Sequence, residues 1–533
     1  MKRLLPVMFI LVMLSPLARG QERGAVRRAV GEYTEILQHI SRLYLDSVDI
    51  DGLARRAVTA LVSGLDPHSA YICAEDAAAM DESLEGGFEG IGIEFAIIGD
   101  TLTVRSVVEG GPASAVGIRA SDRIVRVDTA WISGPGLTNA RVSGLLRGRK
   151  GTKVLLTVLR RGTDGYIEFS VVRDRIPVNS VTASYLDGDS CLYIRLSRFA
   201  ARSHREITDI ISARRGSFSG IILDLRGNSG GYLPVATDIA NEFLCKGDPI
   251  VYTEGLRVRS FEAEADGKGM CAGVPLVLLV DEASASASEI LAGAVQDNDR
   301  GLVIGRRTFG KGLVQQDVPL SGGARLRLTV ARYHTPSGRV IQAPYEMGDP
   351  ESYYAGYAER FSIGEMFSRD SVRLSDSIAF KTLRCGRTVF GGGGIMPDVF
   401  VPEDTSGYTA FYREVLVRGL VTEYMAVAAD RNRSGWLAAC PCEDAFYRDF
   451  HISDNLFADF LSFAESRGVV PEPGQVSRSR SLLSVYMKAL AASALYGHSA
   501  YCRVMNAADP AYIEALESLS SWKESLAASG ISF

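Results

Sequence analysis

Apolar residues recur at helical spacing near the beginning and near the end of the chain. Two such stretches open the chain, at residues 26–45 and 53–65, and Asp66 with Pro67 ends the second. Three more stretches follow residue 405, at residues 410–429, 455–467 and 479–494. The pattern therefore predicts helical regions over residues 21–85 and 405–533.

Between these regions the apolar pattern changes to the period of β-strands. Four short β-rich runs follow one another, at residues 91–98, 101–108, 123–127 and 153–159. Gly99 and Asp100 join the first two runs, and such a pair is a strong hairpin signal. We expect a small independent β module over residues 86–172.

From residue 173 to residue 404, strands alternate with helices. Apolar runs at 221–225 and 274–280 each lead through a turn into a helix, and a third run lies at 302–305. This alternation indicates α/β architecture, in which ligands lie beyond the carboxyl ends of the strands. Residues 344–384 are polar and rich in tyrosine, and we expect them to form an insertion.

The first twenty residues have the features of an export signal. Lys2 and Arg3 precede an apolar stretch over residues 4–17, and Ala18-Arg19-Gly20 offers small residues where signal peptidase cleaves. We therefore expect residues 1–20 to be removed and the protein to be exported, as into a periplasm. An uncleaved signal would instead attach the protein to the membrane.

Composition narrows the classes of partner. A chain of 533 residues predicts several domains, and its net charge of -5 argues against nucleic acid as a main partner. The eight cysteines are too few for a disulfide framework in so long a chain. Cys440 and Cys442 lack the spacing of a zinc knuckle, so we expect no metal there and no other cofactor. We expect a local or long-range disulfide instead, with plain thiols as the alternative.

The run from Asp281 to Glu289 contains the first candidate for chemistry. It leaves an apolar strand and enters a helix, whose unpaired N–H groups can stabilise negative charge. A serine at this position is a plausible nucleophile, although spacing alone does not choose among Ser284, Ser286 and Ser288. Ser286 and Glu289 also have the spacing of a capping box, in which Ser286 would only begin the helix.

The second candidate is Lys311, which lies between two glycines. None of the six histidines falls inside these motifs, so a lysine is the better candidate for the base that activates a serine. Burial would have to lower its pKa by about three units, and Gln315 could orient the amine without adding charge. Gly305, Gly310 and Lys311 match most of a phosphate-binding loop, but Gly312 replaces the required Ser or Thr, so we expect no nucleotide site.

Several motifs in order along the chain resemble those of the C-terminal processing (tail-specific) serine peptidases, which have a PDZ domain and a Ser/Lys site. They are Leu65-Asp-Pro-His-Ser-Ala-Tyr71, Gly90-Ile-Gly-Ile-Glu94, Gly111-Pro-Ala-Ser114, Gly148-Arg-Lys-Gly-Thr152, Asp224-Leu-Arg-Gly-Asn-Ser-Gly-Gly231, Ser284-Ala-Ser-Ala-Ser-Glu289, Thr308-Phe-Gly-Lys-Gly312 and Tyr333-His-Thr-Pro-Ser-Gly-Arg339. The resemblance implies an α/β multidomain protein with a mixed α/β peptidase core like those of crotonase and Clp protease. A PDZ module is inserted into this core, and helical regions lie at both ends.

The resemblance also implies the roles of individual residues. Ser286 would be the nucleophile, Lys311 the general base and Gln315 the support of that lysine. Backbone N–H groups would form the oxyanion hole, from Ala287 and from either Gly230 or Gly231, a choice that stays open. The PDZ module would bind the terminal carboxylate of a substrate through the loop Glu89, Gly90, Ile91, Gly92 and Ile93.

The implied function is that of an exported serine endopeptidase acting on proteins or peptides with free apolar C-termini. Whether a homo-oligomer or an adaptor protein assists it stays open. The alternative is a non-catalytic PDZ protein that binds or assembles partners. The Ser286, Lys311 and Gln315 set favours the enzyme.

Overall fold

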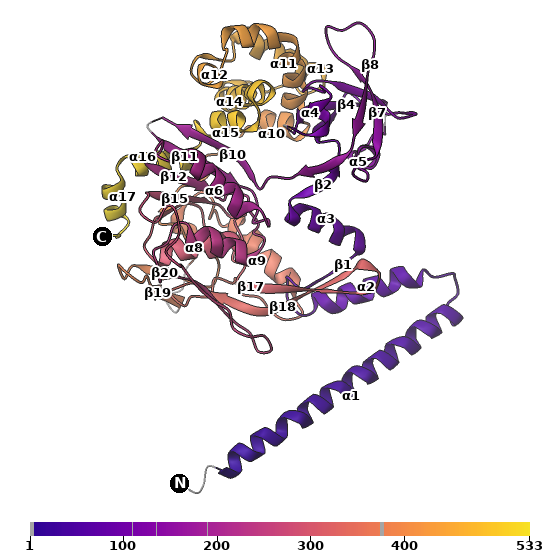
Figure 1. Ribbon diagram of the computed structural model, residues 1–533, viewed down its shortest axis with the longest axis vertical. Coiled ribbons are helices and arrows are strands. Elements are labelled where there is room, and N and C mark those ends of the chain that lie inside the picture. Colours follow the sequence, from indigo (N-terminus) through magenta and orange to yellow (C-terminus); the bar gives the residue numbers. More distant parts are fainter. Residues whose placement is uncertain (1–4, 109, 135, 189, 374–377, 533) are drawn as a thin grey trace.

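The computed structural model describes residues 5–108, 110–134, 136–188, 190–373 and 378–532, with the backbone alone over 5–23 (Figure 1). Of the expected export signal, residues 1–4 lie outside the described residues, and the remainder forms the first part of α1 (Leu5–Leu43). This helix projects away from the body of the molecule (Figure 1). Within the part of the chain described, no helix combines the length and apolarity needed to span a bilayer.

The N-terminal region contains a strand as well as the expected helices. Its remaining elements are α2 (Ile50–Ser63), β1 (Ala70–Ile72) and α3 (Ala74–Glu85). After α2 ends at Ser63, the Asp66 carboxylate accepts hydrogen bonds from the N–H groups of His68 and Ser69, each at 2.9 Å, which form the next turn. The chain then turns into β1, which the helical pattern did not predict and which pairs with a strand of the core.

The small β module forms an antiparallel sheet in the order β3-β4-β5-β7-β8. Its elements are β3 (Ile93–Ile98), β4 (Thr101–Val107), α4 (Pro112–Ala115), β5 (Arg123–Val127), β6 (Ala130–Trp131), α5 (Asn139–Leu146), β7 (Lys153–Leu159) and β8 (Ile167–Val172). Leu102, Val142 and Leu156 belong to a core of its own. A two-stranded ribbon of β2 (Gly87–Gly90) and β9 (Asp174–Pro177) connects the module to the rest of the chain.

The central sheet has six strands in the order β10-β11-β12-β15-β16-β21. They are β10 (Val181–Asp187), β11 (Cys191–Leu196), β12 (Gly220–Asp224), β15 (Leu276–Val280), β16 (Leu302–Gly305) and β21 (Val399–Phe400). From β11 to β21 the pairs are parallel. The helices α6 (Ser203–Ala213), α7 (Leu233–Asn241) and α8 (Ala287–Asp297) connect strands in the manner expected of an α/β fold.

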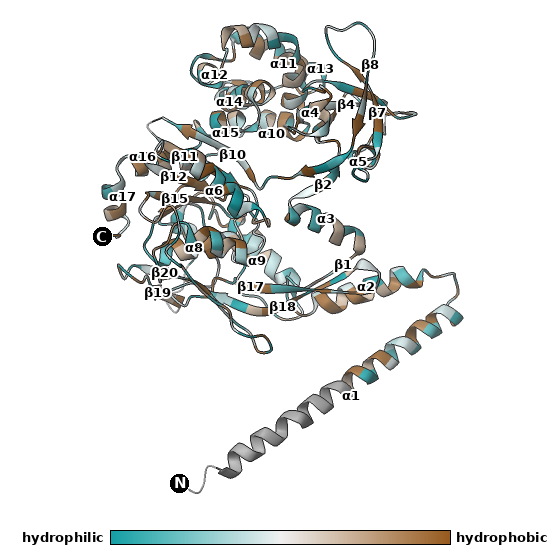
Figure 2. Ribbon diagram, in the orientation of Figure 1, coloured by the Kyte–Doolittle hydropathy of each residue, from teal (hydrophilic) through white to brown (hydrophobic). Residues whose placement is uncertain are grey.

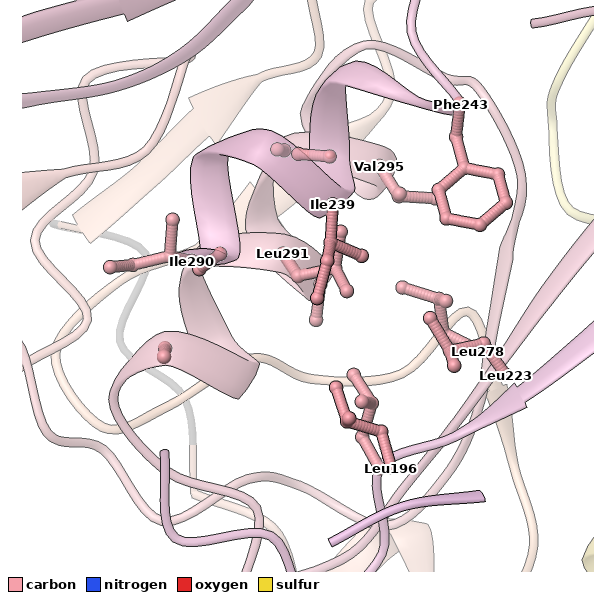
Figure 3. Packing of buried hydrophobic residues seen from close by; sticks show 14 of the residues in the cluster. Leu196, Leu223, Ile239, Phe243, Leu278, Ile290, Leu291 and Val295 are labelled. Atoms are coloured by element: carbon pink, nitrogen blue, oxygen red, sulfur yellow. The ribbon is translucent and has the colours of Figure 1, made fainter. Parts of the chain in front are cut away.

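Both faces of this sheet are covered, which explains the uninterrupted apolar runs of its strands. Leu223 and Leu278 share one core with Ile239 and Leu291 of α7 and α8 (Figure 3). On the opposite face, Tyr512 of α16 (Pro510–Ser520) joins a second core. The strands around β15 accordingly appear brown in Figure 2.

A second sheet lies beside the central one and carries a long hairpin. It contains β1, β13 (Pro249–Glu254), β14 (Glu262–Glu264), β17 (Leu313–Pro319) and β18 (Arg325–His334). The turn of the hairpin is η1 (Ser321–Gly323). The expected insertion contains α9 (Pro350–Ser362), η2 (Arg369–Ser371) and β19 (Ala379–Lys381), which pairs with β20 (Thr388–Phe390).

The C-terminal region is helical throughout, in two parts. Its helices are α10 (Ala410–Val417), α11 (Leu420–Ala439), α12 (Glu443–Asp449), α13 (Asp454–Ser466), α14 (Gln475–Tyr496), α15 (His498–Asn506), α16 and α17 (Trp522–Ala528). Phe457, Phe460 and Met487 belong to a core of the first part, which lies next to the β module (Figure 1). The helices α16 and α17 pack on the central sheet.

The expected disulfide is wrong for this structure, because all eight cysteines are free among the described residues. Cys440 is buried in the helical core, whereas Cys442 is exposed. With one thiol inside the helical core and the other at the surface, the short spacing between them does not lead to a bond.

Candidate active site

The turn between β15 and α8 holds Ser286 in a strained conformation. Its backbone angles are φ 57° and ψ -113°, although it is not a glycine. Such a conformation costs on the order of 1–3 kcal/mol and persists only where the surroundings impose it. The strain is typical of a turn that presents one side chain at the N-terminus of a helix.

The surroundings distinguish the three serines that spacing left equivalent. Ser284 is fully buried, and its hydroxyl donates to Leu225 O at 2.8 Å. Ser288 is also fully buried, and its hydroxyl donates to Asn228 O at 2.8 Å. Ser286 is partly exposed. The two outer serines therefore have structural roles, and Ser286 is the one that a reactant can approach.

The carboxylate of Glu289 connects the Ser286 turn to the segment that carries Lys311. Its Oε2 accepts the N–H groups of Ser286 at 2.8 Å and Lys311 at 2.9 Å. Its Oε1 accepts the Thr308 hydroxyl at 2.6 Å and the Gly310 N–H at 2.8 Å. This carboxylate is the acidic member of the predicted capping box, and it binds the two candidate catalytic residues at once.

Tyr333 of β18 makes a second connection between these segments. Its ring is 1% exposed, and its hydroxyl donates to Ser286 O at 3.2 Å and also to Lys311 O. The backbone positions of Ser286 and Lys311 are therefore fixed relative to each other by buried groups from two separate elements.

The environment of Lys311 favours its neutral form. Burial lowers the pKa of its amine to about 8, and the charge of Arg327 adds to this effect. The charges of Glu289 and Asp66 act in the opposite direction. A lysine with such a pKa can accept a proton near neutral pH.

Gln315 follows Lys311 by four residues and lies in β17. A bulge in β17 falls between Val314 and Gln315. The Gln315 amide donates to Leu313 O at 3.3 Å, and among the described residues no hydrogen bond joins it to Lys311.

The loop after β12 brings the two candidate glycines beside Ser286. A Cβ atom on Gly230 would lie 2.8 Å from Ser286 Cβ and 3.0 Å from Ala287 N, so only glycine fits. The Gly230 N–H already donates to Asn228 Oδ1 at 2.9 Å. Among the hydrogen bonds of the described residues, none uses the N–H of Gly231 or Ala287. These two groups are thus the available donors.

Sequence reasoning assigned no role to His68, which the structure places close to Lys311. Burial and then the Lys311 charge lower the pKa of His68 to about 4, so it is neutral near pH 7. Its ring lies edge-on to Tyr353, with centroids 5.2 Å apart. The sequence could have indicated His68, because it belongs to the motif Leu65–Tyr71. Pairing of β1 with β18 brings this motif to the site.

The expected carboxylate loop of the β module is shorter than predicted. Glu89 and Gly90 belong to β2, and Ile93 begins β3. The Glu89 carboxylate accepts the Lys150 N–H at 3.1 Å. Only Ile91, which is 2% exposed, and Gly92, at φ 78°, form the connection between the strands.

A metal ion has no evident place among these residues. Throughout the described ranges, no three His, Cys, Asp or Glu side chains converge to hold one.

Three family models match the chain. One described as peptidase family S41 matches residues 190–347, and one described as a PDZ domain matches residues 90–171. A family of unknown function matches residues 411–497, within the C-terminal helical region.

Relatives with assigned names match over most of their length. The carboxy-terminal-processing protease of Bartonella bacilliformis is 35% identical over 62% of this chain and 77% of its own. Carboxy-terminal processing protease CtpB of Bacillus subtilis is 31% identical over 64% of this chain and 72% of its own. A solved structure of a photosystem II D1 C-terminal processing protease is 29% identical over 57% of this chain and 88% of that one, with a TM-score of 0.32.

We predict that Gly230→Ala prevents a fluorophosphonate probe from labelling Ser286, because the new methyl group would displace the Ser286 turn. Gly227→Ala is the matched control, since it adds a methyl group at φ 71° with nothing within 4 Å. Both variants place an alanine at a positive φ, which costs more than about 1 kcal/mol, and only the first also introduces a clash. Labelling is followed by mass spectrometry, and equal labelling of the two variants would contradict the contact.

Proposed function

Because the chain belongs to peptidase family S41, as a carboxy-terminal processing serine protease with a PDZ domain, we propose that Ser286 is its nucleophile and Lys311 its general base. The observation that carries this proposal is the Glu289 carboxylate, which binds the backbone N–H groups of both residues. Membership of this family supports an enzyme over the non-catalytic scaffold considered above.

The proposed reaction begins with the neutral Lys311 amine. It takes the proton of the Ser286 hydroxyl as Oγ attacks the carbonyl carbon of the scissile peptide bond. The oxyanion that forms accepts hydrogen bonds from the N–H groups of Ala287 and Gly231, which have no other acceptor among the described residues. Lys311 then returns the proton to the leaving amine, and a water molecule activated by Lys311 hydrolyses the acyl-enzyme.

We assign Gln315 an indirect role. Because its amide is bound to Leu313 O, it stabilises the bulge of β17 that follows Lys311. This assignment differs from the direct support of the amine that the resemblance implied.

For substrate selection we propose that the PDZ domain, placed at residues 86–172, binds free apolar C-termini. The peptide would add a strand beside β3, and the backbone of the Glu89–Ile93 segment would hold its terminal carboxylate. The positive φ of Gly92 turns the chain at this point and supports such a role.

The boundaries of the other domains and the cellular location of the protein are part of the same proposal. We place an N-terminal helical region at 21–85, the peptidase core at 173–404 and a C-terminal helical region at 405–533. An export signal over residues 1–20 would deliver the enzyme to the periplasm.

Replacing either proposed catalytic residue should abolish cleavage. We expect Ser286→Ala and Lys311→Ala to lower kcat by at least about a thousandfold, because each removes a group that takes part in bond making. Lys268→Ala, at a lysine whose side chain is 85% exposed, should cleave normally. Fragments of an unfolded substrate with an apolar C-terminus are identified by mass spectrometry. Cleavage that survives in Ser286→Ala would identify another nucleophile.

Activity should depend on pH through Lys311. Its pKa of about 8 means that the amine is protonated, and unable to act as a base, below that value. We therefore expect kcat/KM to fall about tenfold per pH unit below pH 8 and to level off above it. Initial rates between pH 6 and 10 measure this profile, with circular dichroism as the control for folding. A flat profile across this range would exclude a lysine base.

Amidation of the substrate's C-terminus should weaken its recognition. Hydrogen bonds to a charged group contribute about 1.5–3 kcal/mol, so we expect kcat/KM to fall about 10- to 100-fold. The comparison uses two peptides of the same sequence, one with a free carboxylate and one with an amide. Equal rates for both peptides would count against carboxylate recognition by the PDZ domain.

A further inference from the structure

The tyrosine-rich insertion is fastened to the active site by one buried arginine. Arg360 of α9 is 7% exposed. Its Nη2 donates to Arg307 O at 2.7 Å, and its Nη1 donates to Thr308 O at 2.9 Å and more weakly to Phe309 O at 3.4 Å. These three consecutive carbonyls lie in the segment that leads directly to Lys311.

The other side of the same segment is bound by Glu289. The N–H groups of Gly310 and Lys311 and the hydroxyl of Thr308 all donate to that carboxylate. The segment that carries the proposed base therefore lies between two buried ions. An anion from α8 binds the Thr308 hydroxyl and the N–H groups of Gly310 and Lys311, and a cation from the insertion binds the carbonyls of residues 307–309. The N–H groups of Thr308 and Phe309 donate to the backbone carbonyls of Ile395 and Ser284.

The charge of Arg360 is compensated by the Glu365 carboxylate. Its Nε donates to Glu365 Oε1 at 2.8 Å, and Arg307 donates to both oxygens of the same carboxylate. Removal of Arg360 would therefore leave Glu365 paired with Arg307. A buried charge without a partner, which is the usual reason that such a substitution prevents folding, would not arise.

Tyrosines of α9 reach two other parts of the site. Tyr357 donates to Glu282 O at 3.1 Å, within the turn that precedes Ser286. Tyr354 donates to Pro67 O at 3.1 Å, beside His68, whose ring contacts Tyr353. Phe309 packs against Tyr357, with ring centroids 4.8 Å apart. The helix thus contacts the nucleophile turn, the base segment and the N-terminal turn.

We propose that Arg360 is a positioning residue for the catalytic base, so that Lys311 is correctly placed only while α9 is docked. The proposal rests on the Ser286–Lys311 dyad described above. Buried carbonyl groups must find donors, and without Arg360 those of residues 307–309 turn toward water. A pocket of about 150 Å³ is lined by Arg307, Arg360 and Ile363 among others, so water can enter the space that the guanidinium leaves. The segment then shifts, and the Lys311 amine becomes more hydrated.

The test compares Arg360→Ala and Arg360→Lys with Arg373→Ala, using the free-acid peptide substrate. Arg373 is the matched control, because it lines the same pocket as Arg360 but its side chain is 78% exposed and pairs with Glu359. Among the hydrogen bonds of the described residues, Arg373 donates to none of the three carbonyls. For Arg360→Ala we expect kcat to fall about a hundredfold, the effect of a displacement of about 1 Å in an active site. We expect KM to stay within about twofold, since the PDZ domain is unchanged.

The pH profile distinguishes positioning from a general loss of structure. Hydration of the Lys311 amine raises its pKa toward the ordinary value of 10.5. The pH at which the activity of Arg360→Ala reaches half of its maximum should therefore be higher than in the native enzyme. Arg360→Lys should recover part of kcat, because one ammonium group can satisfy some of the carbonyls. Arg373→Ala should keep both the rate and the profile of the native enzyme.

Two results would overturn the proposal. One is a folded Arg360→Ala variant with the native kcat and pH midpoint. The other is a decrease in kcat that equals the decrease in folded protein, measured by circular dichroism, with the pH midpoint unchanged. An error in the assignment of Lys311 as the base would be recognised separately, because the rise of activity with pH would then persist in Lys311→Ala.

Discussion

The active site depends on the burial of one carboxylate, that of Glu289. Four donors from two segments of the chain surround it, and the residue is fully buried. Burial raises the pKa of Glu289 to about 7, while the hydrogen bonds that it accepts act in the opposite direction. Such a group is costly unless all of its donors are present. These donors include the backbone N–H groups of Ser286 and Lys311. The hydrogen bonds that stabilise the buried carboxylate therefore also fix the distance between the backbones of these two residues.

The rest of the core supplies the rigidity that this arrangement requires. The Ser286 turn follows β15, which is buried in the middle of the central sheet, and it adopts a positive φ that the surroundings must maintain. The loop that contains Gly230 and Gly231 follows the neighbouring strand β12, and Arg226 at its start is paired with Asp224 and with Asp509 of the C-terminal region. Elements from far apart in the sequence therefore hold the proposed nucleophile, the proposed base and the proposed oxyanion donors.

The family implied by the resemblance and the expected mixed α/β fold class are confirmed. Local patterns also predicted several strands of the core and of the β module. The strands β5, β7 and β16 have the predicted bounds, because alternation and turn residues are local signals. The choice among Ser284, Ser286 and Ser288 could not be made from spacing, since it depends on acceptors about 60 residues away. Likewise β1 was missed, because three residues gain their stability from pairing with β18 and not from their own pattern.

The insertion shows most clearly why an element outside the shared motifs can belong to the active site. Its composition, polar with many tyrosines, is typical of a surface segment, and nothing local indicates that Arg360 is buried. What binds it is a set of three carbonyls on another segment, those of residues 307–309, and the N–H groups of the next two residues, Gly310 and Lys311, donate to Glu289. A strand in a sheet would satisfy both sides with backbone partners, but residues 307–310 lie in no strand. The chain instead satisfies the carbonyls of residues 307–309 with a cation, and the N–H groups of Gly310 and Lys311 with an anion. An irregular segment held in this way can place a lysine amine in a position that regular secondary structure would not offer.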